Sequence, residues 1–481
     1  MKINNLIKII SCLILLVVIN SIIFLKTNND FLIILLLSVN IILPIVVLIL
    51  KLNNSIMFDP VNLFSIFYLF VPITGYYFSF IGLRNNQYIY SVLFYNDIDY
   101  LFKITLLYSF IFYVLFVFSC EIVMKSNKSK VNFQIETKAL NLGLIYVLSI
   151  IFLFLGFFNL IYNVFSTSGG DIFHYIKNIV SRSKEFKESG TTILYHFSYV
   201  SIYMYIIYCY CKNRKLSTDI TFYFLLFITL FMKFSTGRIT NTLFFIMSLI
   251  ALTYLLKLSD DKSIKNSKYY LTLVPLGIMG VLFYSFRIVS SYLSYGMNMS
   301  FVDSVKMVID DFGFYAIDKG NLPNIPIIMK IIDSWNNDIG YLWGRSYLSV
   351  LQSLVQTDYV KTSFPIVSIS VKDTWYSNVL GGALPPSIMG EAYANFGILG
   401  ILIFPILFGL IVGLFYKFVL NKRSIWLHII CVQILVGFIF IAPKVESTNL
   451  SPWFIIPTLI AFLSYSILNF TSKTNKSGLK E

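Results

Sequence analysis

Apolar residues occur along the 481-residue chain in long runs separated by short polar stretches. A bilayer core about 30 Å thick is crossed by about 20 helical residues, because each residue advances the helix by about 1.5 Å. By this measure the runs predict an all-α polytopic membrane protein with about 12 transmembrane helices. The predicted spans are residues 6–25, 31–50, 60–83, 101–124, 139–164, 191–211, 217–234, 239–258, 269–289, 391–419, 424–443 and 452–470.

One long segment interrupts this pattern between the ninth and tenth predicted helices. Its apolar residues follow helical spacing over Phe301–Phe314, and a second apolar stretch runs from Ile325 to Trp335. The spacing over Phe301–Phe314 is typical of an amphipathic helix that lies at a membrane interface, and the second stretch is interpreted as a further interfacial or re-entrant segment. We therefore predict three regions, which are nine helices in residues 1–289, a large outer loop with interfacial helices in residues 290–390, and three helices in residues 391–481.

The charged residues exclude a soluble protein and orient the chain. Charged residues make up only 12%, against about 25% in average soluble domains. The net charge of +14 is spread thinly, so no basic stripe indicates nucleic acid as a partner. With a cytoplasmic N-terminus, 20 of the 37 Lys and Arg residues fall on the inside, and seven of the other 17 lie on the long segment. Because cytoplasmic loops are enriched in Lys and Arg, both termini are predicted to be cytoplasmic.

Four arginines lie at predicted outer helix ends or in outer loops, namely Arg182, Arg238, Arg287 and Arg345. The planar guanidinium group binds phosphate oxygens through two parallel hydrogen bonds and stays charged at any working pH. A group of outward arginines therefore indicates a bound anion. The alternative is that each arginine only anchors a helix end at the interface.

A Gly- and Pro-rich stretch precedes the tenth predicted helix. Pro386 and Ser387 favour a helix start, where free backbone N–H groups and the helix dipole attract an anion. Glu391 follows about one turn later, where it could act as a general base or bind sugar hydroxyls. It could also be a carboxylate that only complements the helix dipole. Gly397 and Gly400 could allow close helix packing.

Signals for metals and cofactors are weak. Two acidic pairs, Asp97 with Asp99 and Asp310 with Asp311, could bind a divalent cation but are also typical of solvated loops and helix faces. The three histidines lack metal-ligand spacing, and no phosphate-binding or dinucleotide-binding motif is present. The sequence therefore predicts no metal site and no cofactor.

The stretch that opens the tenth helix resembles one found in bacterial oligosaccharide repeat-unit polymerases, the Wzy-type O-antigen polymerases. These proteins share about a dozen helices, a large outer loop late in the chain, and a Pro-Pro-Ser-x-x-Gly-Glu-x-Tyr-x-Asn-Phe-Gly-x-x-Gly-like segment. The residues that fill this pattern here are Pro385, Pro386, Ser387, Gly390, Glu391, Tyr393, Asn395, Phe396, Gly397 and Gly400.

Other parts of the chain resemble the family less closely. Gly344-Arg345-Ser346 is similar to the usual entry of the outer loop, and Arg238 and Arg287 are similar to arginines at helix ends. The chain departs from the family after that entry. Residues 356–365 replace a segment that often contains Arg and Lys-Pro, so no role is carried over to Lys361.

The resemblance implies a membrane glycosyltransferase with a GT-C-like fold that needs no metal. Its donor would be a growing glycan on undecaprenyl diphosphate, and its acceptor a sugar hydroxyl of an incoming lipid-linked repeat unit. The reaction would make O-antigen or capsular polysaccharide at the outer leaflet of the bacterial cytoplasmic (inner) membrane, with a chain-length regulator as a further partner. The implied catalytic residues are Glu391, Arg238 and Arg345, and the implied substrate-binding residues are Arg182, Arg287, Ser387, Tyr393 and Asn395.

Two other functions fit the helix layout. An O-antigen ligase has a similar layout but transfers finished polymer to a lipid A core. A lipid-linked oligosaccharide flippase is a transporter, and transporters commonly show paired halves with polar sites at the membrane midplane. This chain shows no matching halves, and its polar groups gather at one face of the predicted helices. The polymerase is therefore the favoured prediction.

Overall fold

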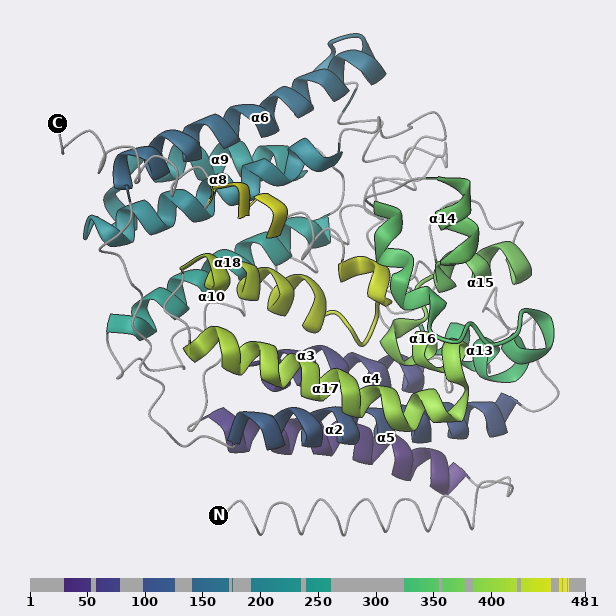
Figure 1. Ribbon diagram of the computed structural model, residues 1–481. Coiled ribbons are helices and arrows are strands. Elements are labelled where there is room, and N and C mark those ends of the chain that lie inside the picture. The colour runs from purple at the N-terminus through teal and green to yellow at the C-terminus, as the bar shows by residue number, and fades with distance from the viewer. Residues whose placement is uncertain are drawn as a thin grey trace, which may run out of the picture. The chain divides into compact units, whose positions relative to one another are not determined.

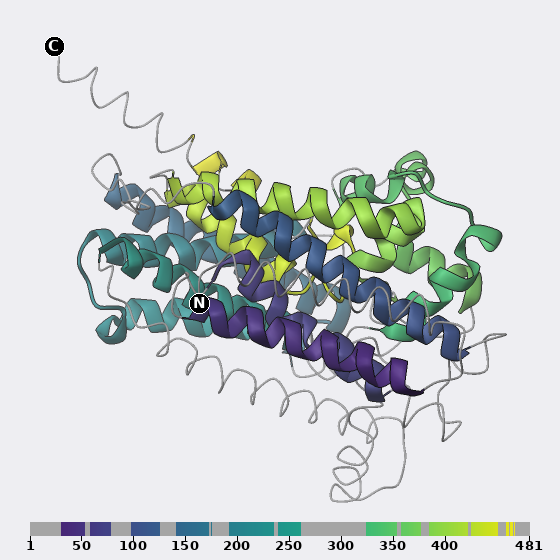
Figure 2. The same cartoon turned by 90° about the horizontal axis from the view of Figure 1, so that it is seen from below.

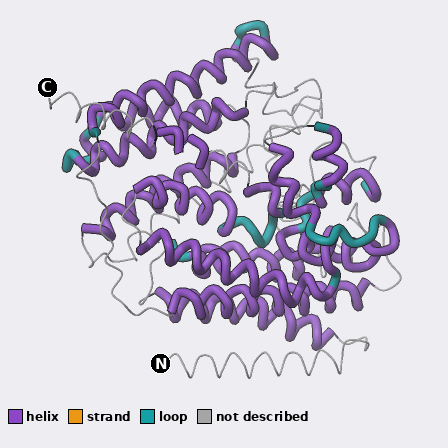
Figure 3. Tube along the Cα trace, viewed as in Figure 1, coloured by secondary structure: helices purple, strands orange, loops and turns teal. Residues whose placement is uncertain are grey.

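The structure is a computed structural model of the whole chain. It describes residues 30–52, 58–77, 98–125, 141–172, 175, 192–234, 239–260, 324–353, 357–376, 384–421, 425–450, 458–460, 462–464 and 466. The regular structure in these ranges is helical, as the sequence predicts (Figure 3). The chain forms two compact units. Unit 1 comprises Met1–Asn127, Gly313–Lys417 and Ile439–Asn449, and unit 2 comprises Lys128–Phe312, Phe418–Phe438 and Leu450–Glu481.

Unit 1 contains the helices that carry the candidate site. They are α2 (Asp30–Leu52), α3 (Pro60–Tyr68), α4 (Phe70–Tyr77), α5 (Ile98–Lys125), α13 (Ile325–Asp338), η4 (Arg345–Ser353), α14 (Asp358–Ser363), α15 (Val367–Trp375), α16 (Ser387–Phe396), α17 (Ile398–Asn421, whose last residues belong to unit 2) and η6 (Ser447–Asn449). Helix α2 packs against α3 and α5, and α13 packs against α5 and α16 (Figure 1).

Unit 2 contains α6 (Leu142–Ser168), α8 (Thr192–Cys211), η3 (Leu216–Thr218), α9 (Ile220–Phe234), α10 (Ile239–Asp260), α18 (Ile425–Ile434) and most of the π-helix η5 (Leu435–Ile439). Helices α6 and α8 lie side by side along their length (Figure 1). Small residues allow this approach, because a Cβ atom on Gly156 would lie 2.8 Å from the Cβ atom of Ser198. The hydroxyl of Ser201 also donates to the carbonyl of Ser149 at 2.6 Å.

Four helices in the described ranges are long and apolar enough to cross a membrane. They are Phe31–Lys51, Ile98–Met124, Leu142–Ser166 and Ile398–Asn421. They coincide with the predicted spans 31–50, 101–124 and 139–164 and with most of 391–419. The predicted spans 191–211, 217–234 and 239–258 are helical as α8, α9 and α10. The spans 6–25 and 269–289, the Phe301–Phe314 segment and most of 452–470 lie outside the described residues, so the number twelve and the GT-C-like fold remain predictions.

Two predicted spans are divided in the structure. The run at 60–83 forms α3 and then α4 as far as Tyr77, where the described part ends. The run at 391–419 contains the end of α16 and the start of α17, which meet at Gly397 with a φ of +60°. Glycine adopts this left-handed conformation without a Cβ penalty, so the chain turns here and does not continue as one helix. The spanning helix therefore begins at Ile398, and Glu391 belongs to the shorter helix before it.

The second apolar stretch of the large loop, predicted as an interfacial or re-entrant segment, is helical as α13. Asn324 caps its first turn by accepting a hydrogen bond from the N–H of Ile327 at 3.3 Å, and Pro326 occupies an early position that suits proline. Its apolar face is buried, including Ile328, Ile331 and Trp335. Helix α13 packs against α16, which carries the candidate site.

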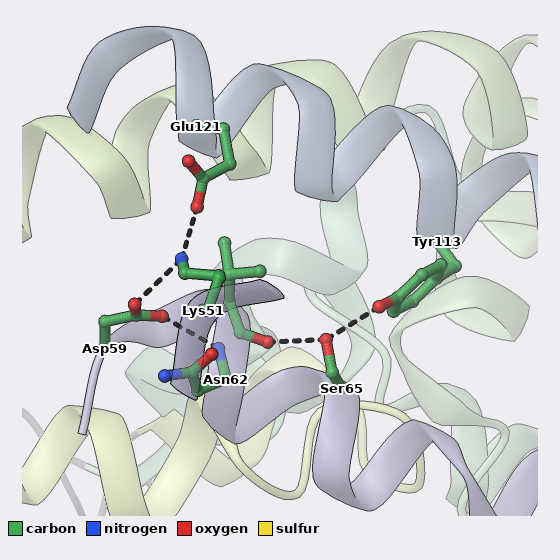
Figure 4. A network of polar contacts seen from close by, with 7 residues as sticks. Lys51, Asp59, Asn62, Ser65, Tyr113 and Glu121 are labelled. Atoms are coloured by element: carbon green, nitrogen blue, oxygen red, sulfur yellow. Dashed lines mark hydrogen bonds and ion pairs between the residues drawn. The ribbon is translucent and has the colours of Figure 1, made fainter. Parts of the chain in front are cut away.

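A partly buried ion network joins α2, α3 and α5 (Figure 4). The ammonium group of Lys51 pairs with Asp59 at 2.8 Å and also with Glu121. Asp59 caps α3, and Ser65 on the same helix hydrogen-bonds to the hydroxyl of Tyr113 on α5 at 2.7 Å. Charges that leave water in this way must be paired, so the network fixes how the three helices meet.

Helix α17 packs closely on α5 (Figure 2). A Cβ atom on Gly409 would lie 2.0 Å from the hydroxyl oxygen of Ser119, and one on Gly413 would lie 3.0 Å from the carbonyl oxygen of Cys120. Two glycines four residues apart thus allow the helix backbones to approach each other. The contact holds α17, which follows α16 in the chain, against α5.

Candidate functional site

Three predicted site residues lie on one face of α16. Ser387, Glu391 and Asn395 are spaced four residues apart, and in a helix this spacing stacks side chains above one another. All three are buried. The helix begins at Ser387, as the sequence predicts. Its buried face is therefore the centre from which the site is built.

The carboxylate of Glu391 joins three segments of unit 1. Its Oε1 atom accepts hydrogen bonds from the hydroxyls of Ser346 at 2.8 Å and Ser447 at 2.6 Å. Its Oε2 atom accepts from the backbone N–H of Ser447 at 2.7 Å. The glutamate is 0% exposed, so these donors replace the water that a carboxylate would otherwise bind. Glu391 therefore connects α16 to the start of η4 and to η6.

Asn395 fixes the loop before η4. Its Oδ1 atom accepts from the N–H of Gly344 at 2.8 Å, and its Nδ2 group donates to the hydroxyl of Ser346 at 2.7 Å. Its carbonyl accepts from the N–H of Trp343 at 3.1 Å. The Gly344-Arg345-Ser346 segment and the Glu391-to-Asn395 segment, about 45 residues apart in sequence, thus lie together.

Arg345 is exposed at the edge of this buried cluster. Its Nε atom donates to the carbonyl of Leu342 at 3.2 Å, which holds the stem of the guanidinium group. Within the described part of the chain, no ion pair of Arg345 is found. The two terminal nitrogens of the group then remain to bind an anion in the bidentate manner expected of arginine.

The start of α16 does not offer the free N–H groups that the sequence led us to expect. The N–H of Ser387 donates to the carbonyl of Lys444 at 3.1 Å, and that of Ile388 donates to the carbonyl of Ala442 at 3.1 Å. The N–H of Gly390 donates to the hydroxyl of Ser387 at 3.2 Å. That expectation was wrong because carbonyl groups of residues 442 and 444 accept from the first two N–H groups and the Ser387 hydroxyl accepts from the N–H of Gly390.

Two charged residues of the site were not singled out from the sequence. Glu446 accepts hydrogen bonds from the N–H of Ser368 at 3.0 Å and from the hydroxyl of the same residue. Burial, and to a lesser degree the charge of Glu391, raises the pKa of Glu446 to about 8. Burial lowers the pKa of Lys444 to about 8. The available signal was a Lys and a Glu directly after the apolar residues 439–443, at the end of a predicted span.

Tyr393 lies on a different side of α16 from Glu391 and Asn395. Its hydroxyl donates to the carbonyl of Ile332 at 3.3 Å, and its ring stacks with Tyr108 at a centroid distance of 6.2 Å. The structure thus uses Tyr393 to pack α16 against α13 and α5. Its predicted role in binding substrate remains a prediction.

The other sequence candidates lie outside the described residues. They are Arg182, Arg238, Arg287, Asp97, Asp310 and Asp311. Among the residues that the structure describes, no group of three His, Cys, Asp or Glu side chains could hold a metal ion. The described site therefore consists of one exposed cation, one partly buried cation and two buried carboxyl groups, namely Arg345, Lys444, Glu391 and Glu446.

The pKa shifts of Lys444 and Glu446, which lie outside the predicted spans, give the site an expected pH dependence. An ordinary glutamate has a pKa of about 4.3, so the raised pKa of Glu446 means that the folded state binds the proton more tightly. Its contribution to stability is fully present below about pH 4 and is lost as the pH rises to about 8. The lowered pKa of Lys444 has the opposite effect on stability. Above about pH 8 the folded protein loses this proton before the unfolded chain does, so the free energy of unfolding rises with pH.

We therefore expect the melting temperature of the detergent-solubilised protein to fall between pH 5 and 8 and to level off or recover above pH 8. Glu446→Gln mimics the protonated carboxyl group and should flatten the fall by several degrees, and Lys444→Met should remove the recovery. Dye-based thermal unfolding across this pH range measures both effects. Equal slopes in the wild type and Glu446→Gln would contradict the assignment.

Comparison with known proteins identifies one family. The sequence model of the O-antigen polysaccharide polymerase Wzy matches residues 7–475, which is nearly the whole chain. No curated protein and no solved structure matches the chain. The family match favours the polymerase over the ligase and the flippase that also fitted the helix layout.

Proposed function

Because the chain belongs to the O-antigen polysaccharide polymerase Wzy family, we propose that it joins undecaprenyl-diphosphate-linked oligosaccharide repeat units at the outer leaflet of the bacterial cytoplasmic membrane. The family makes it a membrane enzyme of polysaccharide biosynthesis, a glycosyltransferase-type polymerase. The proposal adds the lipid diphosphate donor, the outer-leaflet site, cytoplasmic termini and a chain-length regulator as a partner. The product would be O-antigen or capsular polysaccharide.

The proposed step forms one glycosidic bond and breaks another. A hydroxyl oxygen of the acceptor repeat unit attacks the anomeric carbon of the growing glycan, whose bond to the diphosphate oxygen breaks. The lipid diphosphate leaves with the bonding electron pair, and the acceptor hydroxyl gives up its proton. The enzyme must therefore stabilise negative charge on the diphosphate and provide a route for the proton.

Arg345 is the described residue best suited to the diphosphate. It is exposed, its Nε atom is held by the carbonyl of Leu342 at 3.2 Å, and the loop that carries it is bonded to Asn395. A cation that is held in place before the reaction stabilises the developing charge without a cost of rearrangement. This pre-positioned arginine is the single observation that supports the proposal most directly.

The remaining predicted residues keep the roles that the family resemblance implies. Arg238 would share the charge with Arg345, and Arg182 and Arg287 would contact the substrate. Glu391 was predicted to orient or deprotonate the acceptor. Its enclosure supports a positioning role, since it ties the Arg345 loop to η6, and a role in proton transfer remains a prediction.

The test is complementation of a strain that lacks this gene. With Arg345→Ala, we expect single capped repeat units in place of a polymer ladder, because loss of one charge-stabilising group lowers such rates about 10²–10³-fold. Electrophoresis of the extracted polysaccharide measures the ladder. Lys361→Ala is the matched control, because Lys361 is an exposed cation in the same predicted outer loop and pairs only at the surface with Asp358 at 3.6 Å.

Full-length polymer with Arg345→Ala at wild-type protein levels would overturn the proposed role of Arg345. A polymer that forms in the deletion strain itself would overturn the proposed function. Unattached polymer in the deletion strain would instead indicate a ligase.

A further inference from the structure

Trp343 is both strained and exposed. Its φ angle is +52°, a left-handed conformation that bulky residues rarely adopt, and its side chain is 72% exposed. Burial of an indole normally stabilises a protein, so neither its backbone nor its side chain is in the favourable state. Strained residues of this kind persist where the surrounding structure holds them, and they gather at functional sites.

The surrounding structure holds Trp343 from both sides. Its N–H donates to the carbonyl of Asn395 at 3.1 Å, and the N–H of Gly344 donates to the Asn395 side chain at 2.8 Å. The N–H of Arg345 closes the turn on the carbonyl of Leu342 at 3.1 Å. The backbone of the turn is thus fixed to α16, next to the buried face that carries Glu391.

The indole ring is braced by two other aromatic rings. Tyr341 lies at a centroid distance of 6.3 Å and an interplanar angle of 80°, and Phe396 lies at 6.2 Å and 74°. Both are edge-to-face arrangements, which are favourable between aromatic rings. They limit the orientations of the exposed ring, so it is a fixed flat surface.

We propose that Trp343 is the platform on which a sugar ring of the lipid-linked glycan stacks. The C–H groups on one side of a pyranose ring carry partial positive charge and pack against the negative face of an aromatic ring. Arg345, two residues further along the same fixed turn, is the expected contact for the diphosphate to which that glycan is attached. The inference rests on the proposed function and extends it from the diphosphate to the sugar.

An anchor at the membrane interface is the competing explanation for an exposed tryptophan. An anchor needs only a ring at the right depth, and any relaxed backbone supplies that. Here the backbone is strained and is fixed by hydrogen bonds to the helix of the candidate site. The strain and the bracing favour a surface that must be held at a set position relative to Arg345.

Trp375 is a matched control in unit 1. Its indole N–H donates to the carboxylate of Asp338 at 2.7 Å, and the ammonium group of Lys330 lies 5.2 Å from its ring centroid. Its ring also lies edge-to-face against Trp335. A tryptophan whose N–H and ring are already engaged should not offer a platform for a sugar.

The first test is a kinetic assay of the full-length protein in phospholipid nanodiscs with the lipid-linked repeat unit isolated from the source strain. We expect Trp343→Leu to raise KM by up to about tenfold, with a smaller change in kcat. Trp343→Phe should restore most of the affinity because it keeps an aromatic face. Trp375→Leu should leave KM within about twofold of the wild type.

The second test measures tryptophan fluorescence in two arms. The difference in fluorescence between the wild type and Trp343→Phe is taken as the signal of Trp343. One arm adds the repeat-unit oligosaccharide freed from its lipid and diphosphate by mild acid. The other arm uses nanodiscs that contain a doxyl-labelled phospholipid. We expect the oligosaccharide to change the Trp343 signal in a saturable manner.

A Trp343 signal that only the labelled lipid quenches would overturn the inference and identify a membrane anchor. An unchanged KM in Trp343→Leu would also overturn it. In both cases the proposed function stands if Arg345→Ala still abolishes the polymer. Absence of polymerisation by the wild type in this assay would count against the proposed function instead, while the oligosaccharide arm still tests binding.

Discussion

Glu391→Ala should abolish polymer formation and destabilise unit 1. The substitution removes a carboxylate that accepts three hydrogen bonds from Ser346 and Ser447 and leaves the buried Ser346 hydroxyl and the half-buried Ser447 without this acceptor. Loss of a buried network of this kind costs about 2–5 kcal/mol. The loop that carries Arg345 then loses its link to η6 through Glu391 and is left with its hydrogen bonds to Asn395 and the Ser349–Thr448 hydrogen bond, so the arginine is held less firmly.

The amount of folded protein and the length of the polysaccharide measure this effect separately. Thermal unfolding in detergent should show a clear drop in melting temperature, and the complemented deletion strain should show single repeat units. Asp373→Ala, which removes an exposed carboxylate of the same unit, should change neither. Glu391→Ala with normal stability and a full ladder would mean that the carboxylate holds nothing that the reaction needs.

Glu391→Gln separates positioning from proton transfer. A glutamine can still accept the N–H of Ser447 and hydrogen-bond to a serine hydroxyl, so a positioning residue should retain part of its activity with an unchanged pH profile. A general base would lose the basic group itself, and activity would fall to the level of Glu391→Ala, with loss of the corresponding limb of the pH profile. The two outcomes differ most clearly in the rate measured across pH.

Gly400→Val should prevent α16 and α17 from meeting as they do. A Cβ atom on Gly400 would lie 2.0 Å from the carbonyl oxygen of Ala392 and 2.6 Å from its carbon. Both atoms belong to the backbone of α16, so no side chain can move to make space. The expected result is a loss of several kcal/mol, together with loss of polymer, because α16 carries Glu391 and Asn395.

Gly143→Ala is the control for this substitution. Among the residues that the structure describes, and apart from its own helix backbone and chain neighbours, a Cβ atom on Gly143 would meet the Asn141 side chain at 3.6 Å, an ordinary van der Waals distance. Alanine is also the better helix former, so this variant should be as stable as the wild type or slightly more stable. Membrane expression and thermal unfolding compare the two. Wild-type stability in Gly400→Val would contradict the close approach at this corner.

The helices were predictable from the sequence because apolar length is the main determinant of a membrane span. The runs at 31–50, 101–124 and 139–164 became α2, α5 and α6 with ends that differ by a few residues. The division of the run at 391–419 was harder to see, because apolar residues continue through it. Gly397 marks the division through its left-handed φ angle, which hydropathy does not report.

The sequence named residues that the structure brings together, but it did not predict how they are arranged. Glu391, Asn395 and Arg345 were named in advance, and the structure places them in one connected cluster. The sequence could not show that the donors at the start of α16 are occupied, because Ala442 and Lys444 come about 50 residues later. Glu446 was missed for the same reason, since its importance depends on tertiary contacts with Ser368.

The attachment of Ser447 to Glu391 also has a consequence for how the protein is made. The two residues are 56 positions apart, and the segment Ile439–Asn449 is the last part of the chain to join unit 1. The ribosome therefore synthesises Glu391 well before it synthesises Ser447, which donates two of the hydrogen bonds that the carboxylate accepts. During synthesis the cluster around Glu391 is therefore incomplete, and a product truncated before Ser447 would lack the hydrogen bonds that join Glu391 to η6. The proposed site is thus complete only near the end of translation.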